Sequence, residues 1–214
     1  MHETVTADGP TVHGGQRGNR RRSQQSGSSG RWDVRTCDEL QEGQPVDVLS
    51  LRPVDGSDDA VAAADVFAAS RRVAVEAGSI PPGPHPLSDA SRYFRDEVVP
   101  TREVWLAELD GRVVGVLALD AAWLDHLYVL PEQTGARIGG ALLGLAKGLR
   151  PDGFGLWVFL SNAPARAFYE HHGLTEVERT DGSGNEERSP DSHYVWRGGQ
   201  HHGDEASRRG VGRP

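Results

Sequence analysis

Alternating apolar and polar positions predict strands along much of the chain. Two such runs, 103–109 and 112–119, flank Asp110 and Gly111, a dipeptide typical of a type I′ turn, and they predict a hairpin. An earlier run at 46–51 predicts a first strand before Pro53. The same pattern predicts further strands at 123–130, 153–159, 175–179 and 193–197.

Helical spacing predicts four helices between these strands. In the segment 57–76, Val61, Ala64, Phe67 and Val73 lie roughly on one face, and Gly78 follows its end. The other predicted helices cover 89–99, 138–149 and 162–172. The order of elements predicts an α+β fold with one mixed sheet covered by helices.

Both ends of the chain differ from the middle in composition. The chain has 214 residues, with 27 Gly and 13 Pro, and polar, Gly- and Ser-rich stretches concentrate near its termini. Such segments bury too little apolar surface to offset the entropy of ordering. We therefore expect disordered tails at 1–44 and 199–214 around one folded domain at 45–198.

Charge is distributed unevenly between these parts. Residues 1–31 carry +3 and residues 199–214 carry +1, and subtracting both from the net charge of −8 leaves −12 for residues 32–198. An acidic domain disfavours nucleic acid and suits a cationic substrate such as an amine. The triplet 20–22 of arginines could contact nucleic acid, but a solvated tail explains it better.

The remaining composition adds little chemistry. The single cysteine, Cys37, excludes an intramolecular disulfide. No stretch approaches the about 18 apolar residues of a membrane span, and the N-terminus lacks the apolar core of a signal peptide. We expect a soluble cytoplasmic protein without membrane association.

The turn before the helix at 138–149 is a candidate phosphate site. Backbone N–H groups entering a helix converge on an anion, and small residues keep side chains out of the way. The residues that could donate are Gly135, Ala136, Ile138, Gly139 and Gly140, and Arg137 could add a charge. A packing turn explains the glycines equally well. Neither a Gly-Lys-Ser/Thr ending nor a G-x-G-x-x-G pattern is present.

The helix at 162–172 carries a candidate acid. Asn162 and Pro164 are typical of a helix start, and capping alone would explain Asn162. Tyr169 could be a buried structural residue. With the upstream turn present, a second role is favoured, because a tyrosine pKa of about 10 lies close to a thiol pKa of about 8.5. Tyr169 could therefore protonate a departing thiolate.

These two segments together resemble the GNAT superfamily of acetyl-CoA-dependent N-acetyltransferases, over residues 46–197. The motif Asn-x-x-Ala-x-x-Phe-Tyr is complete at Asn162, Ala165, Phe168 and Tyr169. The family's turn, Gln/Arg-x-x-Gly-x-Gly/Ala, is altered. Its Gln/Arg position holds Thr134 and its first Gly position holds Arg137, whereas Gly139 is retained.

The resemblance implies the GNAT fold, a mostly antiparallel mixed sheet of six to seven strands flanked by helices. It implies acetyl-CoA as co-substrate, no metal, and direct attack by a primary amine of a small molecule or peptide in a ternary complex. Tyr169 would be the acid and Asn162 would contact the cofactor. Backbone groups would hold the pantetheine and the pyrophosphate, the former from Leu127, Tyr128 and Val129, and the latter from Gly135, Ala136, Arg137, Ile138, Gly139 and Gly140.

The general base is less defined. Asp125 and His126 lie on the strand that leads into the cofactor site, but as neighbours they point to opposite faces. His126 is attractive because an unperturbed imidazole titrates near neutrality. Surface or hydrogen-bonding roles explain either residue equally well. Glu103, Glu186 and Glu187 are further candidates, and a substrate amine that enters neutral would need no base.

Two other functions remain open from the sequence. One is a non-catalytic acyl-CoA-binding or sensing module, which the altered turn would suit. The other is a nucleic-acid-associated protein that acts through its basic N-terminal tail, to which we give little weight. We expect the loops at 79–88 and 180–191 to wall the acceptor site. The oligomeric state is open, with a homodimer as one option.

Overall fold

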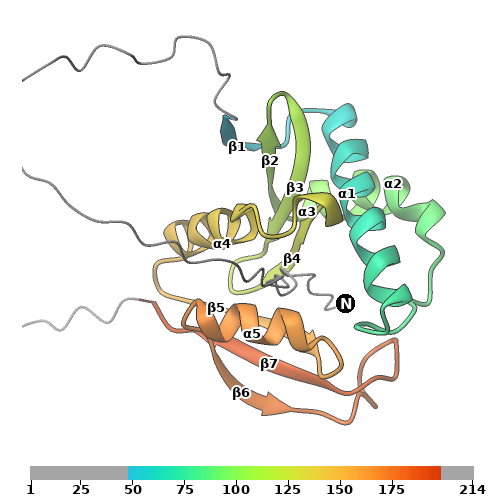
Figure 1. Cartoon of the computed structure of the whole chain (residues 1–214), viewed down its shortest axis with the longest axis vertical. Coiled ribbons are helices and arrows are strands. Elements are labelled where there is room, and N and C mark those ends of the chain that lie inside the picture. The colour runs from blue at the N-terminus through green and yellow to red at the C-terminus, as the bar shows by residue number, and fades with distance from the viewer. Residues whose placement is uncertain (1–47, 199–214) are drawn as a thin grey trace, which may run out of the picture. The chain divides into compact units, whose positions relative to one another are not determined.

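The computed structural model describes residues 48–198 of the chain (Figure 1). The predicted tails, Cys37 and the arginine triplet therefore lie outside the described residues. The strands are β1 (Leu49–Pro53), β2 (Glu103–Leu109), β3 (Arg112–Leu119), β4 (Leu124–Val129), β5 (Phe154–Phe159), β6 (Thr175–Arg179) and β7 (Asp191–Trp196). The longer helices are α1 (Ser57–Glu76), α4 (Ile138–Leu149) and α5 (Ala163–His171), and the short turn η3 (Pro131–Gln133) precedes α4.

The predicted α+β class is confirmed, with the strands arranged as two antiparallel sheets. One sheet has the order β1-β2-β3-β4 and the other β5-β7-β6. Within the described residues they are joined by one parallel bridge, between Trp123 and Gly155, and Gly155 N–H donates to the Ala122 carbonyl at 2.9 Å. Beyond this crossing β4 and β5 diverge (Figure 1). The strands thus form two sheets instead of a single ladder, because β4 pairs with β5 at a single point.

Local signals set most element boundaries. Asp110 and Gly111 have φ of 51° and 80°, which confirms the type I′ turn. The predicted helix at 89–99 is instead a run of short turns, η1 (Leu87–Asp89), α2 (Ala90–Tyr93), η2 (Phe94–Val98) and α3 (Val99–Thr101), with η2 a π-helical turn. Pro100 has no N–H to donate to the Asp96 carbonyl, so a regular α-helical ladder cannot continue through this segment.

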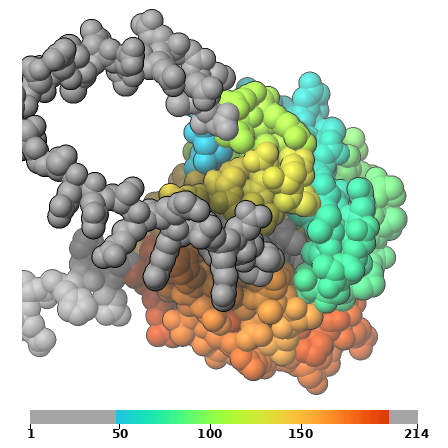
Figure 2. Space-filling view, in the orientation of Figure 1, coloured from blue at the N-terminus to red at the C-terminus, as the bar shows by residue number. Residues whose placement is uncertain are grey.

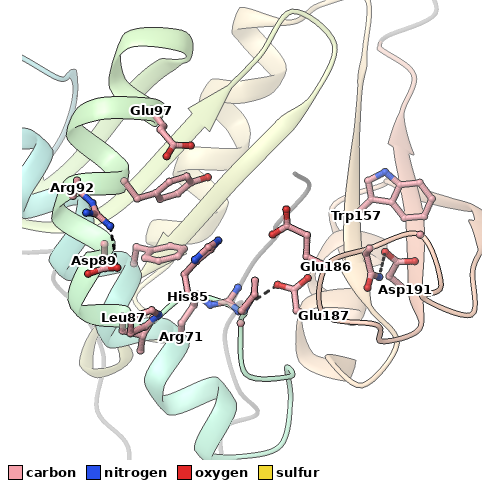
Figure 3. A pocket seen from close by; sticks show the side chains of 18 of the residues that line it. Arg71, His85, Leu87, Asp89, Arg92, Glu97, Trp157, Glu186, Glu187 and Asp191 are labelled. Carbon is pink, nitrogen blue, oxygen red and sulfur yellow. Dashed lines mark hydrogen bonds and ion pairs between the residues drawn. The ribbon is translucent and has the colours of Figure 1, made fainter.

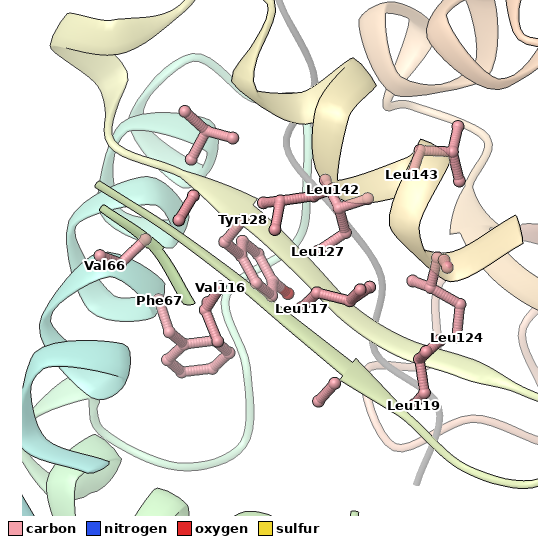
Figure 4. Close-up of a cluster of buried hydrophobic side chains, with 14 of the residues drawn as sticks. Val66, Phe67, Val116, Leu117, Leu119, Leu124, Leu127, Tyr128, Leu142 and Leu143 are labelled. Atoms are coloured by element: carbon pink, nitrogen blue, oxygen red, sulfur yellow. The ribbon is translucent and has the colours of Figure 1, made fainter. Parts of the chain in front are cut away.

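The main core lies on both faces of β3 and β4. Helix α1 covers one face and α4 the other (Figure 1), and every residue of β4 is buried. Figure 4 shows the cluster, in which Phe67 of α1 and Tyr128 of β4 pack with ring centroids 5.1 Å apart. Double coverage explains why β4 lacks a solvent-facing side.

The buried face of α1 differs from the predicted one. Val61 and Val73 are 42% and 47% exposed, whereas the alanines at 60, 63 and 64 are buried together with Phe67. Small side chains let the helix approach the sheet closely, so the contact is formed by these alanines together with Val66 and with Phe67, which was predicted. Figure 2 shows α4 and α5 on one face of the molecule, with α1 beside them.

Gly115 sets the distance between α4 and β3. A Cβ atom at this position would lie 3.0 Å from Leu142, 3.1 Å from Ala107 and 3.2 Å from Ile138. We expect Gly115→Ala to lower the free energy of unfolding by about 1–3 kcal/mol through overpacking. Gly144→Ala, in the exposed middle of α4 with no atom within 4 Å of the added Cβ, is the matched control. It should raise stability by about 0.5–1 kcal/mol. Urea unfolding measures both, and equal effects would contradict the packing argument.

Candidate functional site

The turn into α4 presents a series of backbone donors. Gly135 and Arg137 have φ of 86° and 63°, and the first helical hydrogen bond runs from Ala141 N–H to the Arg137 carbonyl at 3.0 Å. Among the described residues, no backbone carbonyl accepts from the N–H groups of 137–140. Ala136 differs, because its N–H donates to the Gln133 carbonyl at 3.2 Å. The predicted phosphate donors are thus brought together at the helix start, except Ala136.

The backbone conformation of Arg137 shows how the altered motif keeps the shape of the turn. It stands where the GNAT turn has glycine, and its φ of 63° is in the left-handed region that favours glycine. An L-residue there costs roughly 1–2 kcal/mol. The backbone shape of the turn is therefore retained despite the substitution, and the exposed Arg137 side chain adds a positive charge at the helix start.

Helix α5 packs against this turn. A Cβ on Gly139 would lie 3.5 Å from the Phe168 ring, and one on Gly140 would lie 3.2 Å from His172 Nε2. Asn162 caps α5, since its Oδ1 accepts from Ala165 N–H at 3.2 Å. The capping explanation of Asn162 is confirmed, and its contact with a cofactor stays a prediction.

Tyr169 is the most unusual polar group on α5. Its side chain is fully buried, and among residues 48–198 its hydroxyl has no hydrogen-bond partner. Burial, and secondarily the Tyr128 phenol of β4, raise the pKa of Tyr169 well above its usual value. The hydroxyl therefore stays protonated, as an acid must. An unsatisfied buried hydroxyl costs about 1–3 kcal/mol, which is typical of a group that meets its partner in a ligand.

Some backbone groups of β4 point away from β3, toward the space where β4 and β5 diverge. Leu130 N–H donates to the Val114 carbonyl of the neighbouring β3 segment at 2.8 Å. The backbone N–H and C=O groups of successive residues alternate between the two edges of an antiparallel strand. Those of Tyr128 therefore point toward β3, whereas those of Leu127 and Val129 point to the opposite edge. The Val129 carbonyl there accepts from Ser70 Oγ at 2.5 Å. Of the three predicted backbone contacts, two are directed into the divergence.

His126 lies in an aromatic cage on the α1 side of β4. The rings of Phe67, Tyr93, Phe94 and Tyr128 surround it with centroids 5.6–6.0 Å away. Its Nε2 lies 3.3 Å from the Tyr93 hydroxyl, and its Nδ1 is buried without a hydrogen-bond partner. Burial, and then the charges of Arg71 and Arg102, lower the pKa of His126 to about 3. The expectation that it titrates near neutrality was wrong, because the cage removes it from water.

Two other predicted bases are engaged in ion pairs. Asp125 is buried and accepts a short hydrogen bond from Arg102 Nε. Glu103 pairs with Arg150 at 2.9 Å and accepts from the Trp105 indole. Neither is as available to a substrate amine as an unpaired carboxylate, so the base must be sought elsewhere.

A cavity of about 790 Å³ lies between α1, the 83–97 segment and the loop from β6 to β7 (Figure 3). Both predicted wall loops contribute to it, and so do Glu186 and Glu187. The sequence reasoning missed its other walls, which include Phe67, Arg71, Tyr93, Glu97, Trp123 and Trp157. These residues come from four separate parts of the chain, and no local spacing signals their convergence.

An ion pair joins two walls of this cavity. Arg71 of α1 lies 3.8 Å from Glu187 of the β6–β7 loop, and both side chains are almost fully buried. The Arg71 guanidinium also lies 5.7 Å from the Phe67 ring centroid. Glu187 is thereby an anchor for the loop, whereas Glu186, which also lines the cavity, makes no ion pair with another described residue.

A family model described as an acetyltransferase (GNAT) domain matches residues 100–176. An uncharacterized N-acetyltransferase of Archaeoglobus fulgidus is 33% identical over 114 residues, which cover 46% of this chain and 77% of that protein. This chain therefore belongs to the GNAT family of N-acetyltransferases. The matched span holds β4, the α4 turn and Tyr169, whereas most cavity walls lie outside it.

Solved structures agree on the fold. The apo form of YjaB from Escherichia coli is 18% identical with a TM-score of 0.57, covering 71% of this chain and 99% of that one. The PaiA N-acetyltransferase from Thermoplasma acidophilum, solved in complex with coenzyme A, is 19% identical with a TM-score of 0.54, covering 70% and 99%. Within residues 48–198 there is no helix long and apolar enough to cross a bilayer.

The buried His126 should make stability depend on pH. Its pKa of about 3 in the folded state lies below the unfolded value of about 6.5. Between about pH 6.5 and about pH 3, the imidazole of His126 binds a proton in the unfolded chain but not in the folded protein. The free energy of unfolding therefore falls as the pH is lowered through this range. We expect the loss to reach about 1 kcal/mol per pH unit.

His126→Phe should remove this part of the acid slope in urea unfolding between neutral and mildly acidic pH. His171→Gln, at an exposed position of α5, is the control and should keep the slope. Identical slopes in wild type and His126→Phe would show that the imidazole is protonated in the folded state.

Proposed function

We propose that this protein transfers the acetyl group of acetyl-CoA to a primary amine of a small molecule or peptide, by direct attack in a ternary complex. The observation that carries the proposal is the buried, unpartnered hydroxyl of Tyr169, on the helix that packs against the α4 turn. The related PaiA structure holds coenzyme A, which supports the same cofactor here.

Residues of the α4 turn and of β4 suit the phosphates, the pantetheine and the thioester of acetyl-CoA. The N–H groups of 137–140 and the Arg137 guanidinium would bind the phosphates. The backbone edge of β4 at Leu127 and Val129 would align the pantetheine and polarise the thioester carbonyl. Acetyl-CoA supplies an activated acetyl group, and the protein's task is to orient it toward the acceptor.

The chemistry needs two proton transfers. The amine nitrogen forms a bond to the acetyl carbon while the carbon–sulfur bond breaks, giving an amide and a thiolate. Tyr169 donates its hydroxyl proton to the sulfur. The amine must lose its own proton, and neutral His126, with a pKa of about 3, is a poor acceptor at neutral pH.

Glu97 is the better candidate for the base. It lines the large cavity and also a smaller one of about 80 Å³, which it shares with Tyr93, Asp125 and His126. This position supports a role for Glu97 at the β4 end of the proposed acceptor site. Among the described residues its carboxylate makes no ion pair. It can therefore take the amine proton directly or through water.

Tyr169→Phe separates catalysis from folding. We expect kcat to fall by about 10²-fold or more with little change in KM for acetyl-CoA. Stability should be retained or rise, because the substitution removes an unsatisfied buried hydroxyl. Tyr194→Phe is the control, since the Tyr194 hydroxyl donates to Glu170 at 2.8 Å and lies 3.3 Å from Arg166 Nε. It should lose stability and keep kcat. An unchanged kcat in Tyr169→Phe would eliminate Tyr169 as the acid.

Calorimetric titration with acetyl-CoA, desulfo-CoA and ATP tests the cofactor site. We expect micromolar binding of acetyl-CoA, weaker binding to Arg137→Gly, and none for ATP. Arg137→Gly keeps the left-handed turn, so any loss of affinity reports the guanidinium rather than the backbone. Binding without turnover on a panel of amines would favour the sensing module. Absence of all CoA binding would overturn the proposal.

A further inference from the structure

The charges in the large cavity do not cancel. Five carboxylates and two arginines line it. Arg92 pairs with Asp89 at 3.1 Å and Arg71 pairs with Glu187 at 3.8 Å, so each arginine has a carboxylate partner within the walls. An acceptor that carries a carboxylate would find both cations engaged.

The remaining carboxylates differ in their surroundings. Asp191 is buried and hydrogen-bonded, accepting from Thr180 and from Asn185 Nδ2. Glu97 and Glu186 are exposed to the cavity and have no ion pair or side-chain hydrogen bond among the described residues. Two unpaired negative charges therefore face the acceptor.

These two carboxylates belong to opposite walls. Glu97 comes from η2, and Glu186 comes from the loop between β6 and β7. Figure 3 shows both projecting into the cavity, with Glu97 on the helical side and Glu186 on the loop side. Glu97 shares the smaller cavity with two β4 residues, whereas Glu186 does not line it. Glu97 is thus the one of the two that borders β4, the strand on which we propose the thioester lies.

Aromatic rings form another part of the cavity lining. Phe67, Tyr93, Trp123 and Trp157 line the same cavity, and aromatic faces attract ammonium groups as well as apolar chains. His126, which lines the smaller cavity, has a buried Nδ1 without a hydrogen-bond partner among the described residues. The lining of the large cavity therefore combines unpaired carboxylates with aromatic surface.

We propose that the acceptor is a small molecule with two ammonium groups joined by an apolar chain, that is, a diamine or polyamine. The inference rests on the proposed acetyl transfer. The amine to be acetylated lies at Glu97, its chain packs on the aromatic walls, and the second ammonium pairs with Glu186. Glu186 is then a specificity residue rather than a catalytic one.

Steady-state kinetics with three amines test this assignment. Diaminobutane and butylamine share one carbon chain and differ in the second charge, and phenethylamine offers an aromatic body instead. We expect kcat/KM for diaminobutane to exceed that for butylamine by about tenfold or more, the scale of one charge-assisted hydrogen bond. Glu186→Gln should abolish this preference, mainly by raising the KM for diaminobutane. The kcat/KM for butylamine should stay unchanged. Glu97→Gln should lower kcat for both amines.

Glu178→Gln removes the same charge from an exposed position on β6 outside the cavity, and should behave like wild type. Equal rates for diaminobutane and butylamine, or a preference for phenethylamine or for a lysine peptide, would overturn the diamine assignment while leaving acetyl transfer intact. Absence of CoA release with any amine would instead count against the proposed function.

A binding measurement tests the diamine assignment separately from acetyl transfer. Calorimetric titration of diaminobutane into the protein without acetyl-CoA needs no turnover. We expect binding that weakens about tenfold in Glu186→Gln, with butylamine weaker than diaminobutane in the wild type. No difference between the two amines would overturn the inference even if acetyl-CoA binds.

Discussion

The arrangement of the site depends on the single crossing of β4 and β5. Gly155 allows it, because a Cβ there would lie 2.6 Å from His193 Nε2 and 2.8 Å from Trp123. Since the strands touch at this one bridge and then separate, the edge of β4 at Leu127 and Val129 is not closed by a neighbouring strand. The same crossing fixes Trp123 as a cavity wall. A continuous ladder between β4 and β5 would remove the space for a thioester, so the divergence is the condition for everything else.

Two of the buried polar groups near this divergence find no hydrogen-bond partner within the part of the chain that the structure describes. They are Tyr169 Oη on α5 and His126 Nδ1 on β4, and each costs about 1–3 kcal/mol. The apolar core on both faces of β3 and β4 offsets that cost. The two groups differ chemically, because burial raises the pKa of Tyr169 and lowers that of His126. Both therefore remain neutral at physiological pH, which suits proton donation by Tyr169 but not proton uptake by His126. Burial thus keeps Tyr169 protonated, as the proposed acid requires, and argues against His126 as the base.

Much of the fold followed from local sequence signals. The hairpin turn at Asp110, the caps of α5 and the bounds of α1 and α4 depend on neighbouring residues, so periodicity and turn chemistry were sufficient. The turn into α4 and Tyr169 were also found, because both lie in short continuous motifs. Long-range effects were missed. The split of the sheet at Gly155, the desolvation of His126 and the convergence of Glu97, Trp123 and Trp157 on one cavity depend on packing between distant segments, for which a single sequence carries no local spacing.

The proposed cofactor is an anion and the proposed acceptor is a cation, so the two need binding regions of opposite charge. The fold provides these regions at different places. A polyanionic cofactor approaches a chain of net charge −8, so long-range attraction does not assist it. Its binding must come from short-range donors, and these are concentrated at the start of α4, where Arg137 and the N–H groups of 137–140 lie. The unpaired carboxylates of Glu97 and Glu186 instead face the acceptor cavity. If these charges faced the phosphates they would repel the cofactor, and in the cavity they attract an ammonium. In the proposed complex β4 borders both regions, and the amine would have to reach the thioester at the open edge of β4 for direct attack.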